Sequence, residues 1–427
     1  MRRPKSASAR MLASHGVPNR PPATSGVALG NQTAFQEARS ATFGARRIAR
    51  RVVAMGACAV AVVAVAACGS GPSSGSSSGS PAGVPSGTTG GANVSAAQAA
   101  IAPFTGKPSP FPVTEPLSKR LPGGTKFAFL QCATPNCALA GKYYQEAVSA
   151  IGGTFTAVNA GTTAAASQAA ASSVLALKPD VVFVTVDPSL YGDALKKMSD
   201  AGIKVISISV VKDVAPFGVT FNYIGAPEIE EDGRLLADWV IANKGPEANA
   251  VFYSLPAFDF SNLLQRAFET EMAKNCPSCQ VRAVPIDVAT IGTTAPRTIV
   301  TDLQAKPATN VAVFLSLQMA QGLPAAMRAA GLSVTTVGRG PTPVSLQDIK
   351  DGGLTAGLAL DLEVGGWIGV DAGARLLLGD QPTANEKTGV LIKQFLGQKD
   401  IVFDPTNGWS GYPDFKNRFA ALWHTGG

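Results

Sequence analysis

Residues suited to catalysis are scarce in this chain. Histidine, the usual general base, occurs only as His15 and His424, so a histidine-based triad has no candidate base in the central part of the sequence. The stretch Gly71-Pro72-Ser73-Ser74-Gly75 fits the pattern G-x-S-x-G, but it lies in a Gly/Ser-rich segment with no strand before it or helix after it. The sequence contains no G-x-x-x-x-G-K-[ST] loop, and Gly338-Arg339-Gly340 lacks the third glycine of a dinucleotide fingerprint. We therefore expect a protein that is not an enzyme and needs no cofactor.

Cys68 has the surroundings of a residue that is modified during export. An Arg-rich segment (Arg46, Arg47, Arg50, Arg51) precedes about 16 uncharged residues, and small residues then lead to Val65-Ala66-Ala67-Cys68. This arrangement resembles the lipobox of bacterial lipoproteins, in which the cysteine thiol is acylated and the peptide is cut before it. An ordinary signal peptide or a short membrane anchor is the alternative. We expect residues 1–67 to be a leader and residues 68–120 a lipidated cysteine followed by a flexible tether.

The charge of the chain is concentrated in this leader. The formal net charge is +7, yet residues 1–67 contain 10 Lys and Arg and one acid, Glu37, whereas the remainder contains 26 basic and 28 acidic residues. A nearly neutral mature domain has no electrostatic footprint for phosphate, so we expect no nucleic-acid partner.

Four cysteines remain in the part expected to fold, in two close pairs: Cys132 with Cys137, and Cys276 with Cys279. Close pairs in an exported protein favour two local disulfides. A shared zinc site is the rival, although the two pairs fall on what we interpret as different lobes, and we expect no metal. Cys276-Pro277-Ser278-Cys279 also has the form of a redox motif. It follows a predicted helix and precedes a strand, where no helix N-terminus would stabilise a thiolate, so a structural disulfide is favoured.

From Lys126 onward, short β-branched runs alternate with amphipathic stretches. This pattern predicts strands at 127–131, 154–159, 181–186 and 204–210, separated by helices at 140–151, 163–177 and 193–201. The rhythm restarts after Tyr223 with helices at 228–242, 260–274, 297–305, 322–330, 345–350 and 367–378 and strands at 250–255, 280–288, 311–317, 335–338 and 354–360. Nearly continuous apolar runs between helices indicate parallel sheets that are covered on both faces. The predicted fold class is therefore α/β, with two doubly wound lobes and a ligand cleft at the C-terminal ends of their strands.

The succession of elements resembles the type I periplasmic binding proteins, in particular the ribose- and sugar-binding components of ABC transporters. The motifs that carry the resemblance are Lys178-Pro179-Asp180-Val181-Val182-Phe183-Val184, Ala201-Gly202-Ile203-Lys204-Val205-Ile206, the helix from Gly225 through Gly233, and Met327-Arg328-Ala329-Ala330-Gly331. The family fold implies three hinge crossovers, expected near Asn222, Leu360 and Thr383. Lobe 1 would then comprise residues 121–222 and 361–385, and lobe 2 residues 223–360 and 386–427.

The resemblance also indicates which residues should face the ligand. Family sugar binders place an Asn and two aromatics after the first strand, where this chain keeps Asn136 and lacks both aromatics. Most of the family's charged sugar clamp is replaced, because its positions correspond to Ser209, Asn262, Ser316 and Gly340. The ligand-binding residues predicted from these positions and from neighbouring loops are Asn136, Asp187, Ser209, Tyr223, Phe258, Asp259, Asn262, Ser316, Gln318, Arg339 and Asp361.

Several of these residues have a structural alternative. Asp187 could cap a helix, and Phe260, next to Asp259, could be a hydrophobic staple as readily as a stacking ring. Arg339 could pair with a ligand carboxylate or with Asp361 across the cleft. Because the charged clamp is largely absent, we expect a ligand less polar than a simple sugar or held by fewer charge-assisted bonds.

What the resemblance implies for function is the capture of a small solute between two closing lobes. The protein would be a monomer anchored by its lipid to the outer face of the cell membrane, and it would deliver its ligand to an ABC permease. The alternative is a membrane-tethered sensor of the same fold whose closed form engages a signalling partner. A transcription regulator of this fold is disfavoured by the export signal and by the missing helix-turn-helix.

Overall fold

The computed structural model describes residues 91–426 except 109, 162, 186 and 389–391. The leader, Cys68 and the Gly/Ser-rich segment lie outside the described residues. The described part belongs to one compact unit of the chain, Gly83–Gly427. None of its helices is long and apolar enough to cross a membrane.

Lobe 1 is built on a five-stranded parallel sheet with the order β2-β1-β3-β4-β5. Its strands are β1 (Lys126–Gln131), β2 (Thr154–Asn159), β3 (Val181–Val184), β4 (Lys204–Ile208) and β5 (Phe221–Tyr223). Its helices are α2 (Pro135–Ala150), α3 (Ala164–Leu177), α4 (Ala194–Asp200) and α10 (Leu362–Leu378). Along β1 the side chains alternate between the two faces of the sheet. Ala128 and Leu130 pack in the cluster with α3 and α4, and Phe127 and Phe129 pack in the cluster that includes α2 and α10.

Lobe 2 contains a six-stranded sheet with the order β11-β10-β9-β8-β6-β7, in which only β11 is antiparallel to its neighbour. The strands are β6 (Asn249–Ser254), β7 (Gln280–Pro285), β8 (Val311–Phe314), β9 (Thr335–Arg339), β10 (Ala356–Leu360) and β11 (Lys393–Gly397). The helices are α5 (Ala226–Lys244), α6 (Asp259–Asn275), α7 (Ala295–Ala305), α8 (Leu323–Ala329) and α9 (Pro343–Lys350).

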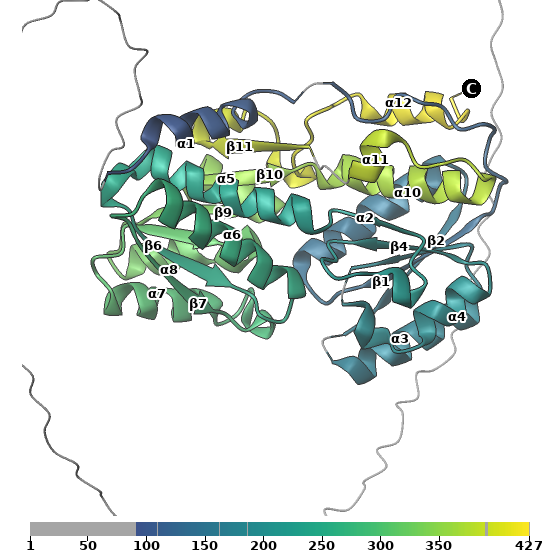
Figure 1. The fold of residues 1–427 in the computed structure, drawn as a ribbon, viewed down its shortest axis with the longest axis horizontal. Coiled ribbons are helices and arrows are strands. Elements are labelled where there is room, and N and C mark those ends of the chain that lie inside the picture. The colour runs from purple at the N-terminus through teal and green to yellow at the C-terminus, as the bar shows by residue number, and fades with distance from the viewer. Residues whose placement is uncertain (1–90, 109, 162, 186, 389–391, 427) are drawn as a thin grey trace, which may run out of the picture. The chain divides into compact units, whose positions relative to one another are not determined.

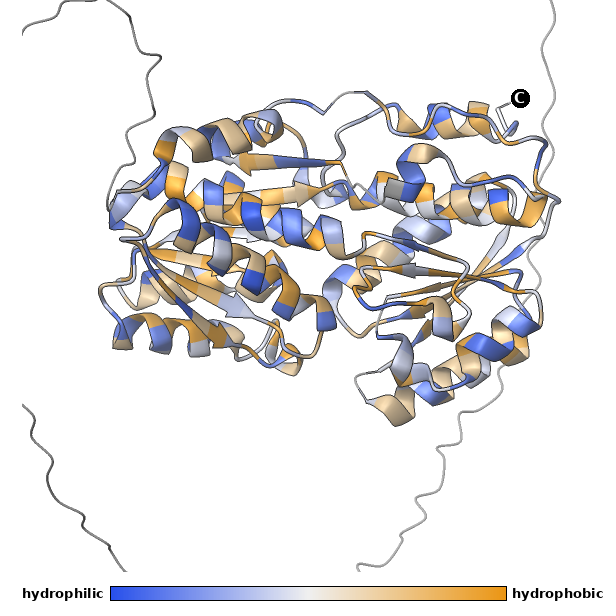
Figure 2. Ribbon diagram, in the orientation of Figure 1, coloured by the Kyte–Doolittle hydropathy of each residue, from blue (hydrophilic) through white to orange (hydrophobic). Residues whose placement is uncertain are grey.

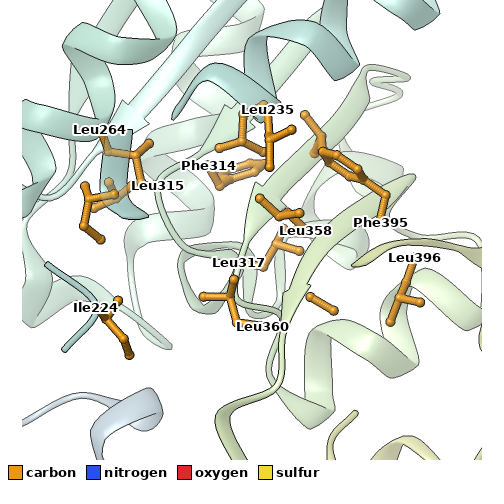
Figure 3. Close-up of a cluster of buried hydrophobic side chains, with 14 of the residues drawn as sticks. Ile224, Leu235, Leu264, Phe314, Leu315, Leu317, Leu358, Leu360, Phe395 and Leu396 are labelled. Carbon is orange, nitrogen blue, oxygen red and sulfur yellow. The ribbon is translucent and has the colours of Figure 1, made fainter. Parts of the chain in front are cut away.

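The central strands of both lobes are buried along their whole length, as their uninterrupted apolar sequences predict. The hydropathy colouring of Figure 2 shows apolar strands inside helices whose outer surfaces are polar. In lobe 2, Leu235 of α5 lies beside Phe314 of β8, and Leu358 and Phe395 continue this cluster across β10 and β11 (Figure 3).

The chain passes between the lobes at three places near the cleft. It leaves lobe 1 after Tyr223 and returns at Asp361, and it re-enters lobe 2 with β11 after the short helix α11 (Ala384–Thr388). The first hinge therefore follows a short strand, β5, that was not predicted. This strand completes the lobe 1 sheet and places Tyr223 in lobe 1.

The C-terminal helix α12 (Phe415–Leu422) corrects one predicted boundary, because it packs on lobe 1 and not on lobe 2. Trp423, directly after α12, stacks on Trp367 of α10 with ring centroids 5.0 Å apart. Its indole Nε1 donates to Asp371 Oδ1 at 2.6 Å. Figure 1 shows α12 beside α10, after the chain has left β11.

The segment before lobe 1 is also not a tether along its whole predicted length. Helix α1 (Val94–Ile101) packs against α5 and α6 of lobe 2, and the backbone N–H of Asn93 donates to Asn275 O at 2.7 Å. The chain then runs to lobe 1, where Leu117 and Leu121 are buried and the Leu117 N–H donates to Leu422 O. We name residues 105–121 the N-terminal strap and residues 398–414 the C-terminal strap, since both pass between the lobes. They are joined where Tyr412 Oη donates to Pro110 O at 2.5 Å.

Candidate functional site

A cavity of about 120 Å³ lies between the lobes, at the C-terminal ends of the strands of both sheets. That volume suits one small solute. Lobe 1 contributes residues after β1, β3, β4 and β5, lobe 2 contributes residues after β6, β8 and β9, and the crossover from β10 to α10 completes the wall. The lining residues are Cys132, Thr134, Asn136, Cys137, Ala140, Tyr144, Thr185, Ile208, Ser209, Tyr223, Ile224, Leu255, Phe258, Phe260, Ser316, Gln318, Arg339, Gly340, Leu360, Leu362, Gly365 and Gly366.

Three of the predicted binding residues meet across the cleft. The backbone N–H of Asn136, in the first turn of α2, donates to Gln318 Oε1 of lobe 2 at 3.2 Å. The Asn136 side-chain Nδ2 donates to Ser316 Oγ at 3.1 Å. The remaining side-chain atom, Asn136 Oδ1, is buried and has no hydrogen-bond partner among the described residues. A buried carbonyl acceptor without a partner is costly, so this atom is suited to accept a hydrogen bond from a ligand.

Arg339 lines the cavity, but it does not pair with Asp361, which the sequence offered as an alternative to a ligand carboxylate. Its Nε lies 2.5 Å from Oδ2 of Asp232, a fully buried residue of α5. The other carboxylate oxygen of Asp232 is 2.7 Å from Lys393 Nζ. Burial alone would raise the pKa of Asp232, but Lys393 and Arg339 outweigh it and hold that pKa below its ordinary value. Asp232 was not predicted as a site residue. The sequence around a carboxylate in the middle of a helix does not show that its side chain contacts a residue at the end of a strand.

The network around Lys393 continues to two more carboxylates. Lys393 Nζ is 2.7 Å from Glu228 Oε1 and 2.7 Å from Glu231 Oε2. Burial, followed by the nearby charge of Asp232, raises the pKa of Glu228 to about 7. The guanidinium of Arg339 thus lies at one end of a buried ionic network, and its positive charge is compensated by carboxylates of the protein.

Phe258 and Phe260 form an aromatic pair on the lobe 2 side of the cavity. Their ring centroids are 5.4 Å apart and nearly parallel, and Arg339 lies 5.9 Å from the Phe260 centroid. Asp259, between them in sequence, does not line this cavity. It faces a smaller neighbouring cavity of about 50 Å³ that also contains Asp187.

Asp187 has the structural role that was considered as its alternative. Its Oδ1 accepts from the backbone N–H of Ser189 at 3.0 Å, which caps a short 3₁₀ turn, and its Oδ2 pairs with Lys212. Burial opposes ionisation of Asp187, but the bonds from Lys212 and Ser189 lower its pKa. Across the cleft, burial and the charge of Asp187 raise the pKa of Asp259. These two acids therefore lie beside the main cavity and not in its wall.

The hinge side of the cavity is closed by tyrosines and by a glycine-rich helix. Tyr223 Oη is 2.9 Å from Tyr144 Oη and donates to Gly365 O at 3.0 Å. A side chain at Gly369 would force Tyr223 to shift, because its Cβ would lie 2.8 Å from Tyr223 Oη. Burial raises the pKa of Tyr223 well above its ordinary value, so its hydroxyl stays protonated.

Besides Asp187 and Asp259, two more predicted binding residues lie away from the cavity wall. Asp361 is fully buried and caps α10 by accepting from the Val364 N–H at 3.0 Å. Its Oδ2 accepts from Ser410 Oγ and the Gly411 N–H at 3.0 and 2.7 Å, so it fixes the C-terminal strap. Asn262 is exposed on α6 and does not line the cavity. Asp361 thus lies at the crossover from β10 to α10, and Asn262 lies on the surface of α6.

Ser209 does line the cavity, with a left-handed backbone conformation (φ 59°) at the end of β4. Among the lining residues that were not predicted to bind the ligand, three carry hydroxyl groups: Thr134, Tyr144 and Thr185. Thr134 and Thr185 follow β1 and β3 and could have been found from the rule that ligands bind at strand ends. Tyr144 lies in the middle of α2, where its ring stacks on Phe183 with centroids 4.4 Å apart and its hydroxyl is hydrogen-bonded to Tyr223.

The four cysteines form two disulfides, Cys132–Cys137 and Cys276–Cys279, in the pairs that the spacing favours. Cys132 and Cys137 line the cavity and join the residue after β1 to the first turn of α2, which carries Asn136. Cys276 and Cys279 join the end of α6 to β7, outside the cavity. Among residues 91–426, apart from the gaps noted above, no cluster of His, Cys, Asp and Glu could hold a metal ion.

Two α/β lobes with a cavity between their strand ends define a bilobed solute-binding protein. Residues 130–381 match the family model described as periplasmic binding protein domain, and the chain belongs to that family. Its members are extracytoplasmic, non-enzymatic ligand binders. A comparison with curated proteins found no match.

Solved structures share the fold at low sequence identity. The 5-methylthioribose transporter solute-binding protein of Thermotoga lettingae is 16% identical, with a TM-score of 0.60 over 73% of this chain and 99% of that chain. An ABC transporter periplasmic solute-binding protein of Actinobacillus succinogenes with bound D-allose is 18% identical, with a TM-score of 0.56 over 64% and 97%. A solute-binding protein of Mycobacterium smegmatis with bound glycerol is 16% identical, with a TM-score of 0.56 over 65% and 96%.

Proposed function

We propose that this protein captures a small solute outside the cytoplasm and delivers it to the permease of an ABC importer. The observation that carries the proposal is the cavity whose wall comes from both lobes, with Asn136 of lobe 1 bonded to Ser316 and Gln318 of lobe 2. A site divided in this way is completed only when the lobes approach, so ligand binding and closure are coupled. A closed form of defined shape is what a permease can distinguish from the empty protein.

The comparisons support this function, because the proteins from Thermotoga lettingae, Actinobacillus succinogenes and Mycobacterium smegmatis are transporter solute-binding proteins. In this proposal Cys68 carries the lipid anchor, and the segment between Cys68 and α1 spans the distance from the membrane surface. The described part acts as a monomer.

Uptake and localisation test the two parts of the proposal separately. Cells lacking the protein should lose uptake of a solute that raises the melting temperature of the purified protein, and the wild-type gene should restore it. Unchanged uptake of every such solute would contradict the transport role. Mass spectrometry of the membrane fraction should find a diacylated N-terminal Cys68, and a retained leader would contradict the anchor. A Cys68→Ala variant should restore less uptake, since the protein would no longer be held at the membrane.

A further inference from the structure

Resting on the proposed function, we propose a ligand class for the cavity: an uncharged ring or polyol compound in which an apolar group replaces a hydroxyl group of a simple sugar. Three properties of the wall support this class: its charge, its free hydrogen-bonding groups and its apolar surface.

The wall does not favour a charged ligand. None of the described lining residues is Asp or Glu, so a cationic group would find no carboxylate. The single charged lining residue among them is Arg339, and its charge is compensated by Asp232 at 2.5 Å. An anionic ligand would have to compete with a fully buried carboxylate that Lys393 holds in place at 2.7 Å. Transfer of an uncompensated charge into such a site is costly, so the site selects a neutral solute.

Several polar groups of the wall are already hydrogen-bonded within the protein. Tyr144, Tyr223 and the Gly365 carbonyl bond to one another, and the amide groups of Asn136 are bonded to Gln318 and Ser316. The buried amide oxygen that remains without a partner is Asn136 Oδ1. Each buried hydroxyl that lacks a partner costs on the order of 1–3 kcal/mol, so a solute with many hydroxyls would bind poorly. Besides Asn136, the wall offers the side chains of Ser209, Thr185 and Gln318, so it suits a ligand with a small number of well-placed hydroxyl groups.

Apolar side chains fill most of the rest of the wall. The stacked pair Phe258 and Phe260 is joined by Leu255 from lobe 2, by Ile208 from lobe 1, and by Ile224 and Leu362 from two of the crossovers. This surface would bury an alkyl, alkylthio or aryl group favourably and would desolvate a hydroxyl without compensation. The apolar substituent of the ligand is therefore expected to face Phe258 and Phe260.

Matched ligand pairs test this inference by thermal shift and calorimetry on the mature protein. The pairs are D-ribose and 5-methylthioribose, D-allose and its methyl glycoside, and glycerol and its phenyl ether, with ribose phosphate as an anionic probe. The apolar member should bind about tenfold more tightly than its parent in each pair that binds. Parents that bind as tightly, or ribose phosphate as the tightest ligand, would overturn the inference and leave the proposed function standing. Absence of a shift with every probe would also overturn the inference, whereas the proposed function is decided by the uptake experiment.

Variants locate the effect within the cavity. Phe258→Ala should weaken the binding of the apolar member by about tenfold and weaken the binding of its parent clearly less, because the apolar group is the part of the ligand expected to contact the ring. Phe155→Ala is the matched control, since Phe155 is a partly buried ring on β2 that does not line the cavity. Equal losses for both members of a pair in Phe258→Ala would show that the ring does not recognise the apolar group, and would overturn the inference.

Discussion

Trp367 and Trp423 stack with ring planes 6° apart, although they are separated by β11, the C-terminal strap and α12. Trp367 belongs to α10, the helix that enters lobe 1 beside the ligand cavity. The stack therefore fixes the C-terminus of the described chain to the helix that forms one side of the hinge.

Replacement of Trp423 by Phe should lower the free energy of unfolding by about 1–3 kcal/mol. The change removes the hydrogen bond to Asp371 Oδ1 and leaves a fully buried carboxylate oxygen without that donor. Chemical denaturation followed by circular dichroism measures the loss. Trp409→Phe, at a partly exposed tryptophan, is the control and should lose less than about 1 kcal/mol. Equal losses in the two variants would show that the bond to Asp371 does not contribute.

Asp232→Asn should destabilise the protein by about 3–5 kcal/mol, because Arg339 and Lys393 would both lose their shared buried partner. Glu231 offers a matched control, since its carboxylate is also 2.7 Å from Lys393 Nζ but its side chain is 38% exposed. Glu231→Gln should cost no more than about 1 kcal/mol. Urea unfolding of both variants gives the comparison.

The same Asp232→Asn variant should gain affinity for ribose phosphate, since Arg339 would then present an uncompensated positive charge to the cavity. Calorimetric titration of the variant and the wild type measures this change. A variant that unfolds normally yet still rejects the anion would show that Asp232 does not control charge selectivity.

Glu386 should give the protein a pH-dependent stability. Burial, and then the charge of Asp371, raise its pKa to about 9, whereas an unfolded glutamate titrates at about 4.3. Between these values the folded state holds the additional proton, so this residue lowers the free energy of unfolding as the pH rises. Glu386→Gln should remove the contribution of this residue to the fall in unfolding free energy. The melting temperature of the variant minus that of the wild type should therefore increase from pH 5.5 to pH 8.5.

Calorimetry across this pH range tests the expectation. Glu247→Gln, at an exposed glutamate after α5, should follow the wild-type curve at every pH. Parallel curves for Glu386→Gln and wild type would mean that Glu386 is ionised in the folded protein.

The two disulfides should differ in their effect on binding and not in their effect on stability. Both close short loops, so replacing either pair by alanines should cost roughly 2–3 kcal/mol of unfolding free energy. Loss of Cys132–Cys137 should also weaken 5-methylthioribose binding by about tenfold, because it removes part of the cavity wall and the covalent link that holds the first turn of α2, which carries Asn136. Loss of Cys276–Cys279 should leave the dissociation constant unchanged. Equal binding by both double variants would contradict a positioning role for the first disulfide.

Most of the fold could be predicted from the sequence, because buried parallel strands such as β3 and β8 are uninterrupted apolar runs. The elements that were missed lack this signal. Strand β5 is three residues long, and β11 contains Lys393, whose burial depends on carboxylates that are distant in sequence. The packing of α1 was missed because its Ala-rich sequence gives little indication of which surface covers it.

The site could be predicted only in part. Residues directly after strands, such as Asn136, Ser316 and Arg339, were found because parallel strands end at one edge of a sheet. The partners of these residues were not found, since the pairing of Arg339 with Asp232 depends on how α5 packs on the sheet. Asp361 was misplaced because an acid after a strand can cap the next helix as readily as it can face a ligand.

The two straps affect whether the protein stays assembled after proteolytic cleavage. Together with the three passages near the cleft, they connect the lobes five times, and neither lobe is one continuous stretch of sequence. A protease that cleaves an exposed loop between β6 and β10 would leave two fragments that both contribute strands to the lobe 2 sheet, and so remain associated under native conditions. Neither lobe could be produced from a single uninterrupted piece of the gene. The two halves of the binding site are therefore encoded by segments of the gene that alternate along its length.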